Sequence, residues 1–274
     1  MTNNDCKIYP SASQAIMLLV IALFIEVIVN LPLSVYDYFN STDYLFNKYK
    51  SFFLVIAVNA FILIYGVVRS NDLIKNIFPS RGFTLVAIIP VFLVVLCMQH
   101  FIIYANSAVI SFIPVPIWFE ELFSKVLWSE FGFVGQVARV AIFAPLVEEF
   151  IFRGVIMRGL LRKYSPFFAI VFSAILFAGY HLNPWQFSVA IYLGIFLAWL
   201  RYKTRNIWLP VLAHSLNNFI VLIGSSEFRP RWALTISEYL TSITGVQYAI
   251  VLLLSLLLLM WVLWRYPKSD ETKV

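Results

Sequence analysis

The stretch FTLVAIIPVFLVVLCMQHFII, residues 83–103, contains no charged side chain and points most directly to the class of protein. Further apolar runs cover residues 15–33, 52–68, 131–152, 167–180, 185–200, 207–224 and 248–264. A membrane-spanning helix needs about 20 apolar residues. Several runs approach this length, and the shorter ones continue into amphipathic flanks. We therefore predict an all-α fold, a polytopic transmembrane helical bundle of about eight spans.

The composition favours lipid as the main solvent of the chain. Only 12% of the 274 residues are charged and 61% are hydrophobic, whereas soluble domains carry about 25% charged residues. The net charge of +6 is modest, and Lys and Arg gather at the ends of the apolar runs. This pattern predicts contacts with membrane lipid and no nucleic-acid partner. Cys6 and Cys97 show neither a metal-binding spacing nor a disulfide framework.

The distribution of positive charge predicts the orientation in the membrane. Lys and Arg cluster at positions 69–81, 153–163 and 201–205, and the alternate connections are neutral or acidic. By the positive-inside rule, we expect a multi-pass protein of the cell membrane with both termini cytosolic. Residues 1–10 lack a basic region followed by a cleavage site, so we expect the first apolar run to be a retained span. Residues 111–130, with two prolines and Trp118, predict an interfacial segment.

A pair of glutamates ends the apolar run 131–152, where charge is costly. On a helix, Glu149 and Arg153 are i,i+4 neighbours and can form an ion pair. Glu148 then points about 100° away, without a partner in its own sequence neighbourhood. A poorly hydrated carboxylate of this kind suits a general base. The alternative is that both glutamates are interfacial charges at a helix end.

His181 ends the next apolar run and predicts a partner for Glu148. If the helix that carries Glu148 continues to Lys163, a turn at residues 164–166 makes an antiparallel hairpin, with Pro166 in the first turn of the second helix. Glu148 and His181 then lie at similar distances from that turn. An acid and an imidazole that face each other can activate water. Taken alone, a histidine at a helix end is more often interfacial.

The third polar group is His214-Ser215-Leu216-Asn217-Asn218, about two turns into the helix that starts near Ile207. His214 and Asn218 are i,i+4 neighbours, and Asn217 can share their face. An imidazole and an amide side by side can donate hydrogen bonds to an oxyanion. The alternative is a polar patch that joins helices within the membrane. His181 and His214 are expected at different depths, so tilted or broken helices are needed to bring them together.

Two other polar pairs are predicted to have no chemical role. Glu26 and Asn30 form one face of the first span and indicate a helix–helix contact. His100, next to Gln99, ends a span and indicates an interfacial position.

The motifs Glu148-Glu149-x-x-x-Arg153, Phe177-x-x-x-His181 and His214-x-x-x-Asn218, in this order, resemble those of the CPBP family of intramembrane proteases. This family, also called ABI, includes the type II CAAX prenyl endopeptidases. The resemblance covers residues 131–224 and includes the Ile-Trp-Leu-Pro sequence at 207–210. Arg205 stands where many relatives have Gly.

The resemblance implies an intramembrane catalytic cavity in which Glu148 and His181 activate water for attack on a peptide bond. His214 and Asn218 would stabilise the oxyanion, and Glu149, Arg153 and Asn217 would be supporting residues. The family was long described as metalloproteases. Two histidines and the carboxylates could bind zinc, but Asn is a poor zinc ligand and a His-Glu-x-x-His helix is absent. We favour a mechanism without a metal or other cofactor.

The resemblance also suggests a division of the chain and leaves an alternative function open. Residues 1–130 would form the N-terminal transmembrane helices with the interfacial segment, residues 131–224 the catalytic core, and residues 225–274 the last transmembrane helix and a cytosolic tail. The expected partner is a peptide or protein substrate at the membrane, prenylated or not. Some family members are assigned immunity or regulatory roles without proteolysis, and this is the alternative. A small transporter is disfavoured, because inverted repeats and paired broken helices are absent.

Overall fold

The computed structural model describes residues 8–40, 45–80, 85–119, 132–225 and 245–264, and over these ranges the chain is all-α. Every apolar run predicted from the sequence coincides with a helix. The separate helices are α1 (Ala12–Asn40), α2 (Leu45–Ser70), α3 (Ile74–Ile77), α4 (Leu85–Phe112), α9 (Pro166–Tyr180), α10 (Pro184–Thr204), α11 (Trp208–Ser225) and α13 (Gly245–Trp264). One longer helix is built from α6 (Gly132–Gln136), η1 (Val137–Phe143), α7 (Ala144–Glu149), η2 (Phe150–Ile156) and α8 (Met157–Lys163).

Length and composition single out one membrane-spanning candidate among the described helices, Ala12–Val29 in α1, with a mean hydropathy of 2.5. Shorter apolar helices cover Leu54–Ser70, Ala87–Gln99, Pro166–Tyr180, Trp208–Ile223 and Gly245–Trp261. The all-α class is therefore confirmed, and the number of spans stays a prediction.

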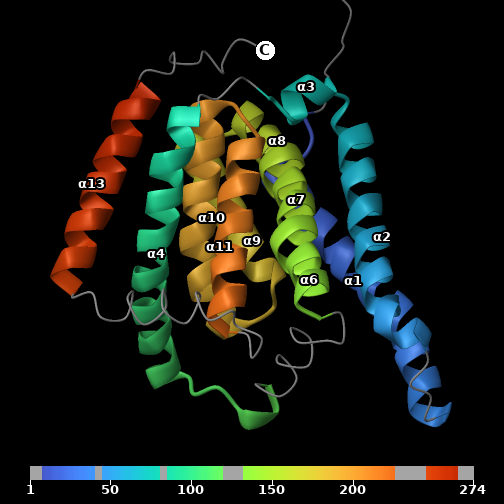
Figure 1. Cartoon of the computed structure of the whole chain (residues 1–274). Coiled ribbons are helices and arrows are strands. Elements are labelled where there is room, and N and C mark those ends of the chain that lie inside the picture. Colours follow the sequence, from blue (N-terminus) through green and yellow to red (C-terminus); the bar gives the residue numbers. More distant parts are fainter. Residues whose placement is uncertain (1–7, 41–44, 81–84, 120–131, 226–244, 265–274) are drawn as a thin grey trace, which may run out of the picture.

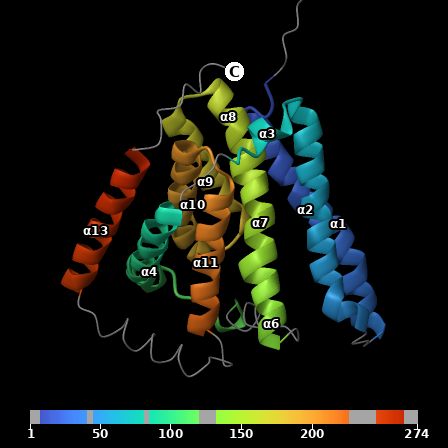
Figure 2. The same cartoon turned by 45° about the horizontal axis from the view of Figure 1, so that its top comes forward.

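The helices form one bundle, with α1 and α2 at one edge and α13 beside α4 at the other (Figure 1). The helices that carry the three motifs, α7, α9 and α11, lie in the middle together with α10, as the tilted view also shows (Figure 2). One hydrophobic cluster joins α1, α2, η2, α8 and α9, and a second joins α4, α10, α11 and α13. The polar motifs are therefore held between two apolar clusters.

The helix ends around the motifs have clear local causes. Ser165 accepts a hydrogen bond from the Phe168 N–H and Pro166 opens α9, which confirms the hairpin turn predicted at residues 164–166. Asn183 caps α10 by accepting from the N–H groups of Trp185 and Gln186. Arg205 ends α10 in the left-handed conformation, with φ 48° and ψ 39°. This is the conformation that glycine adopts most readily, and here an arginine adopts it.

The basic clusters meet at one end of the bundle. Asp72, in the α2–α3 connection, accepts a hydrogen bond from Arg158 of α8 at 2.9 Å and lies 3.6 Å from Arg162. The segment after α3 also contacts the α10–α11 turn, where the Ile207 N–H donates to the Pro79 carbonyl at 2.8 Å. Figure 1 shows α3, α8 and this turn at the same end. The charge clusters used for the topology prediction thus lie on one side of the fold.

The predicted interfacial segment lies only partly within the described residues. Residues 120–131 lie outside them, and Glu120 and Glu121 belong to that range. Ile117 and Trp118 are exposed, with 75% and 65% of their surface accessible.

Candidate active site

A fully buried ion pair forms the centre of the site. Glu149 and Arg153 are both 0% exposed, and their side chains approach to 3.0 Å between Oε1 and Nη1, which confirms the predicted i,i+4 pair. Arg153 also donates through Nη2 to the Gly194 carbonyl of α10 at 3.2 Å. Its guanidinium lies over the Phe177 ring of α9, 4.4 Å from the centroid. Arg153 thereby links the helix of the first motif to α9 and α10.

Gly194 allows this linkage because α10 passes close to α9 at this point. A β-carbon on residue 194 would lie 3.1 Å from the Ala174 β-carbon and 3.2 Å from the Phe177 ring. These distances are tight, so a larger residue would push α10 away from α9 and move the carbonyl that accepts from Arg153.

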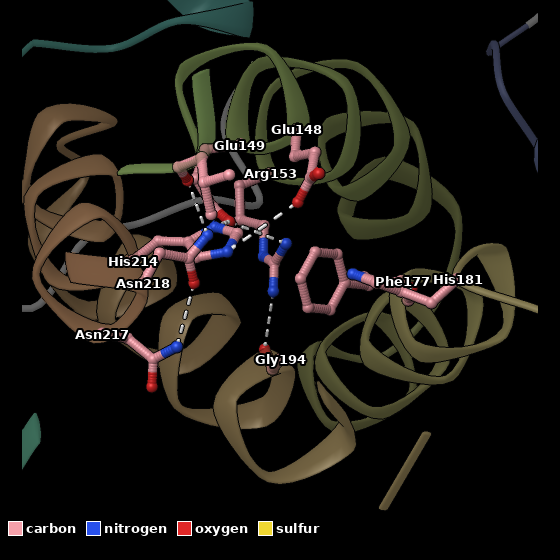
Figure 3. Close-up of polar contacts among 10 residues, drawn as sticks. Glu148, Glu149, Arg153, Phe177, His181, Gly194, His214, Asn217 and Asn218 are labelled. Atoms are coloured by element: carbon pink, nitrogen blue, oxygen red, sulfur yellow. Dashed lines mark hydrogen bonds and ion pairs between the residues drawn. The ribbon is translucent and has the colours of Figure 1, made fainter. Parts of the chain in front are cut away.

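His214 lies between the two glutamates. Its Nδ1 is 2.9 Å from Oε1 of Glu149, and its Nε2 is 3.8 Å from Oε2 of Glu148 (Figure 3). An ionised carboxylate can only accept, so Nδ1 carries the proton and donates to Glu149. The Arg153–Glu149–His214 chain therefore fixes the orientation of the imidazole and directs Nε2 towards Glu148. The sequence predicted a supporting role for Glu149 and gave no sign of this bond to the third motif.

Glu148 is the more accessible of the two glutamates. Its side chain is 24% exposed and lies 3.8 Å from His214 Nε2. This distance is too long for a hydrogen bond. Glu148 is thus a carboxylate at the edge of a buried polar cluster, next to an oriented imidazole. That position suits a group that must exchange protons with water or substrate.

Phe177 separates the two histidines. Its ring centroid is 5.0 Å from that of His181 and 5.5 Å from that of His214, with an edge-on geometry in both cases. Figure 3 shows the phenyl ring between them. Phe177 is the α9 residue level with His214, and His181 follows one turn later, about 6 Å further along the axis. The sequence predicted that His181 and His214 lie at different depths, and the Phe177 ring contacts both of them.

Among the described residues, no hydrogen bond or ion pair joins Glu148 to His181, and their joint activation of water stays a prediction. The ring of His181 instead donates from Nδ1 to the Phe177 carbonyl at 2.9 Å. A carbonyl can only accept, so the neutral ring keeps its lone pair on Nε2. His181 thus presents a hydrogen-bond acceptor one turn away from the Glu148–His214 level.

The amide of Asn218 is hydrogen-bonded to the long helix that carries Glu148 and Arg153. Its Nδ2 donates to the Val140 carbonyl at 2.9 Å, and its Oδ1 accepts from Asn217 at 3.0 Å. The Val140 carbonyl is available because the helix is π-type here: the Ala144 N–H donates to the Arg139 carbonyl, five residues back. In this pattern the next N–H, at residue 145, would donate to Val140. Pro145 has no N–H, so the Asn218 amide satisfies the carbonyl.

The two pairs predicted to have no chemical role differ in outcome. Tyr180 donates to Glu26 at 3.2 Å, so Glu26 makes the helix–helix contact expected of it. Gln99, the neighbour of His100, donates its amide to Asn217 at 2.6 Å inside the bundle. The side chains of Asn30 and His100 lie outside the described residues.

The residues present do not fit the zinc site considered from the sequence. Within the described ranges, no three His, Cys, Asp or Glu side chains are grouped as metal ligands. The Phe177 ring separates His181 from His214, and Glu149 and the Nδ1 of His214 are already bonded to each other. We therefore derive no chemical step through a metal.

Comparison with known proteins gives a family match over the region of the site and one similar curated protein. Residues 130–220 match the family model described as type II CAAX prenyl endopeptidase Rce1-like. A stretch of 87 residues is 34% identical to the protein named "Putative membrane peptidase YdiL" of Bacillus subtilis (strain 168). That stretch is 32% of this chain and 36% of the relative's length. No solved structure gives a significant match.

Proposed function

The chain belongs to the CPBP family through residues 130–220, and on this basis we propose that it is a membrane endopeptidase that cleaves peptide bonds with a glutamate-activated water. One observation supports the proposal most strongly. His214 is held by the buried Glu149–Arg153 pair and faces Glu148, the accessible carboxylate. If the two glutamates were only interfacial charges, there would be no reason for a buried ion pair that orients an imidazole towards the second acid.

In the proposed reaction, Glu148 is the general base. It takes a proton from a water molecule whose oxygen attacks the carbonyl carbon of the scissile peptide bond. Glu148 then returns the proton to the amine nitrogen as the carbon–nitrogen bond breaks. The partial exposure of Glu148 supports this role, because Glu149 is fully buried and already bonded to Arg153 and His214.

His214 and Asn218 are the proposed oxyanion donors. Since His214 Nδ1 donates to Glu149, donation to an oxyanion from Nε2 requires a proton on both nitrogens. Asn218 keeps one amide N–H after its bond to Val140, and this N–H is the second donor. His181, whose Nε2 has no hydrogen-bond partner among the described residues, is proposed to hold the attacking water or the substrate one turn away.

The proposed substrate is a peptide at the membrane, and prenylated C-terminal peptides are the first class to test. Purified protein in liposomes would be incubated with a farnesylated peptide that carries a fluorophore and a quencher on either side of the prenylated cysteine. We expect cleavage by the wild type and at least about 100-fold slower cleavage by Glu148→Gln, the lower range for loss of a general base. Activity should survive exhaustive chelation.

The competing outcome is a family member without proteolytic activity. Equal signals from wild type and Glu148→Gln, with this probe and with membrane proteins compared by proteomics, would favour an immunity or regulatory role instead. Cleavage lost on chelation and regained with one equivalent of zinc would keep the peptidase and overturn the metal-free mechanism.

We also propose that the bundle spans the membrane with its basic end in the cytosol. Lys75 lies at the basic end and Leu182 at the α9–α10 turn, and both are exposed. In a variant without Cys6 and Cys97, single cysteines at these positions should react with impermeant reagents from opposite sides. Labelling of both from one side would contradict the span count and the orientation.

A further inference from the structure

Four polar groups form a continuous hydrogen-bonded chain from α4 to the first motif's helix. Gln99 donates to Asn217 Oδ1 at 2.6 Å, Asn217 donates to Asn218 Oδ1 at 3.0 Å, and Asn218 donates to the Val140 carbonyl at 2.9 Å. Gln99 lies in α4, before residues 130–220, the region that matches the family model, and outside all three motifs. The chain therefore joins a helix outside the motifs to the amide proposed to hold the oxyanion.

The direction of every bond in this chain follows from the Val140 carbonyl. A carbonyl can only accept, so the Asn218 nitrogen must face Val140 and its oxygen must face Asn217. Asn217 must then turn its nitrogen towards Asn218 and its oxygen towards Gln99. Gln99 in turn must present its nitrogen. The π-helical register and Pro145, which leave Val140 without an intrahelical donor, thus determine the orientation of three amides.

This orientation matters for catalysis because the N–H groups of an amide stabilise an oxyanion, whereas its oxygen repels one. With Oδ1 held by Asn217, the second N–H of Asn218 is left for the substrate oxygen. A rotated Asn218 amide would place its oxygen there. The neighbouring donor that holds Oδ1 is Asn217, whose own oxygen is held by Gln99. Consecutive bonds in the same direction strengthen one another in a poorly hydrated interior.

We propose that Gln99 is a positioning residue for the reaction, which acts through Asn217 to hold the Asn218 amide in its donor orientation. The proposal rests on the proposed peptidase function for its catalytic consequence. Its structural part, the control of Asn218 by Gln99, does not depend on any activity.

The structural part is tested by NMR exchange of the side-chain amide protons in ¹⁵N-Asn-labelled protein in micelles. In Gln99→Met, which keeps the length of the side chain and removes the donor, the Asn217 and Asn218 amide protons should exchange about tenfold faster or more. Gln247→Met is the matched control, since it makes the same change at an exposed position in α13. Unchanged exchange in Gln99→Met would overturn the proposal.

The catalytic part is tested with the farnesylated peptide. Loss of an outer partner of a catalytic group costs on the order of 10–100-fold, so kcat of Gln99→Met should fall by about tenfold with KM unchanged. Gln99→Glu should fall at least as far, because a carboxylate accepts and cannot donate to Asn217, and it serves if Gln99→Met does not fold. In an Asn218→Ala background, Gln99→Met should cause no further loss. An equal loss in both backgrounds would show a general structural effect instead.

The proposed peptidase function and the Gln99 proposal can fail separately. If neither the wild type nor Glu148→Gln cleaves the peptide, the proposed function fails, and the exchange rates still decide whether Gln99 holds Asn218. If the wild type cleaves the peptide and Gln99→Met matches it in kcat and exchange, the proposed function stands and the Gln99 proposal is wrong.

Discussion

Replacing Glu149 with glutamine should damage both stability and activity, whereas the same change at Glu148 should damage activity alone. The substitution keeps the size and shape of the side chain and removes its charge. At position 149 it leaves Arg153, which is 0% exposed, without the carboxylate that lies 3.0 Å away. At position 148 the side chain is 24% exposed and lies 3.8 Å from His214.

The difference in magnitude follows from burial. Breaking a buried ion pair by removing one partner typically costs about 3–5 kcal/mol, because the other charge stays buried and uncompensated. For a chain of this size, such a loss lowers the melting temperature by roughly 6–20 °C. Changes at partly exposed ionic positions usually stay within about 1 kcal/mol. Glu149→Gln also weakens the hold on His214, so its cleavage rate should fall on the order of 100-fold or more.

The assay is thermal unfolding of the purified variants in one detergent, with cleavage of the farnesylated peptide measured in parallel. Arg153→Met in the Glu149→Gln background provides the internal control. Removing both charges together should restore part of the lost stability, since the buried cation is then gone. Equal melting temperatures for Glu149→Gln and the wild type, or equal losses of stability at positions 148 and 149, would refute the reasoning.

Three further predictions concern other parts of the fold. Asn218→Ala should cost about 2.7–4 kcal/mol in the chemical step with little change in KM, because the oxyanion bond strengthens only in the transition state; a rise in KM alone would contradict this. Arg205→Gly should be about 1–2 kcal/mol more stable than Arg205→Ala and should melt at a higher temperature, because glycine is not strained at φ 48° and alanine is. Equal melting temperatures of the two variants would contradict this. Burial raises the pKa of Asp72, but hydrogen bonds from Asn76, Arg158 and the Leu73 N–H outweigh it and hold the pKa below its usual value. The stability from Asp72 is therefore present above about pH 3.9 and lost as pH falls through the folded pKa, so Asp72→Asn should melt lower than wild type at pH 7 and match it in strong acid.

The sequence was sufficient for the features that depend on local patterns. Apolar runs predicted every helix around the site, because burial and length are recorded in the composition of each run. The hairpin at residues 164–166 followed from the proline that fits the first turn of the second helix. The Glu149–Arg153 pair followed from helical spacing alone. Each of these depends on residues within a few positions of one another.

The contacts between motifs were not predictable in the same way. Helical spacing places Glu148 and Glu149 about 100° apart, and it gave no sign that both approach the third motif. An imidazole has two nitrogens on opposite sides, and His214 uses both to face the two carboxylates. The expected Glu148–His181 pair assumed that residues at equal distances from a turn meet, but the Phe177 ring occupies that position beside His214.

Gln99 shows what a reading from one helix at a time misses. A glutamine near the end of an apolar run indicates an interface if the run is considered alone. Its actual partner is 118 positions away, and the partner's orientation depends on a carbonyl that Pro145 leaves without a donor. A proline within a predicted helix usually predicts a kink. Because proline has no N–H, it also predicts that one carbonyl in the preceding turn needs a hydrogen-bond donor from elsewhere. In a membrane bundle, where water rarely supplies that donor, the nearest amide on a packed helix is the natural candidate. Searching apolar helices for such prolines, together with Asn or Gln on other helices, is therefore a way to locate oriented amides before a structure is known.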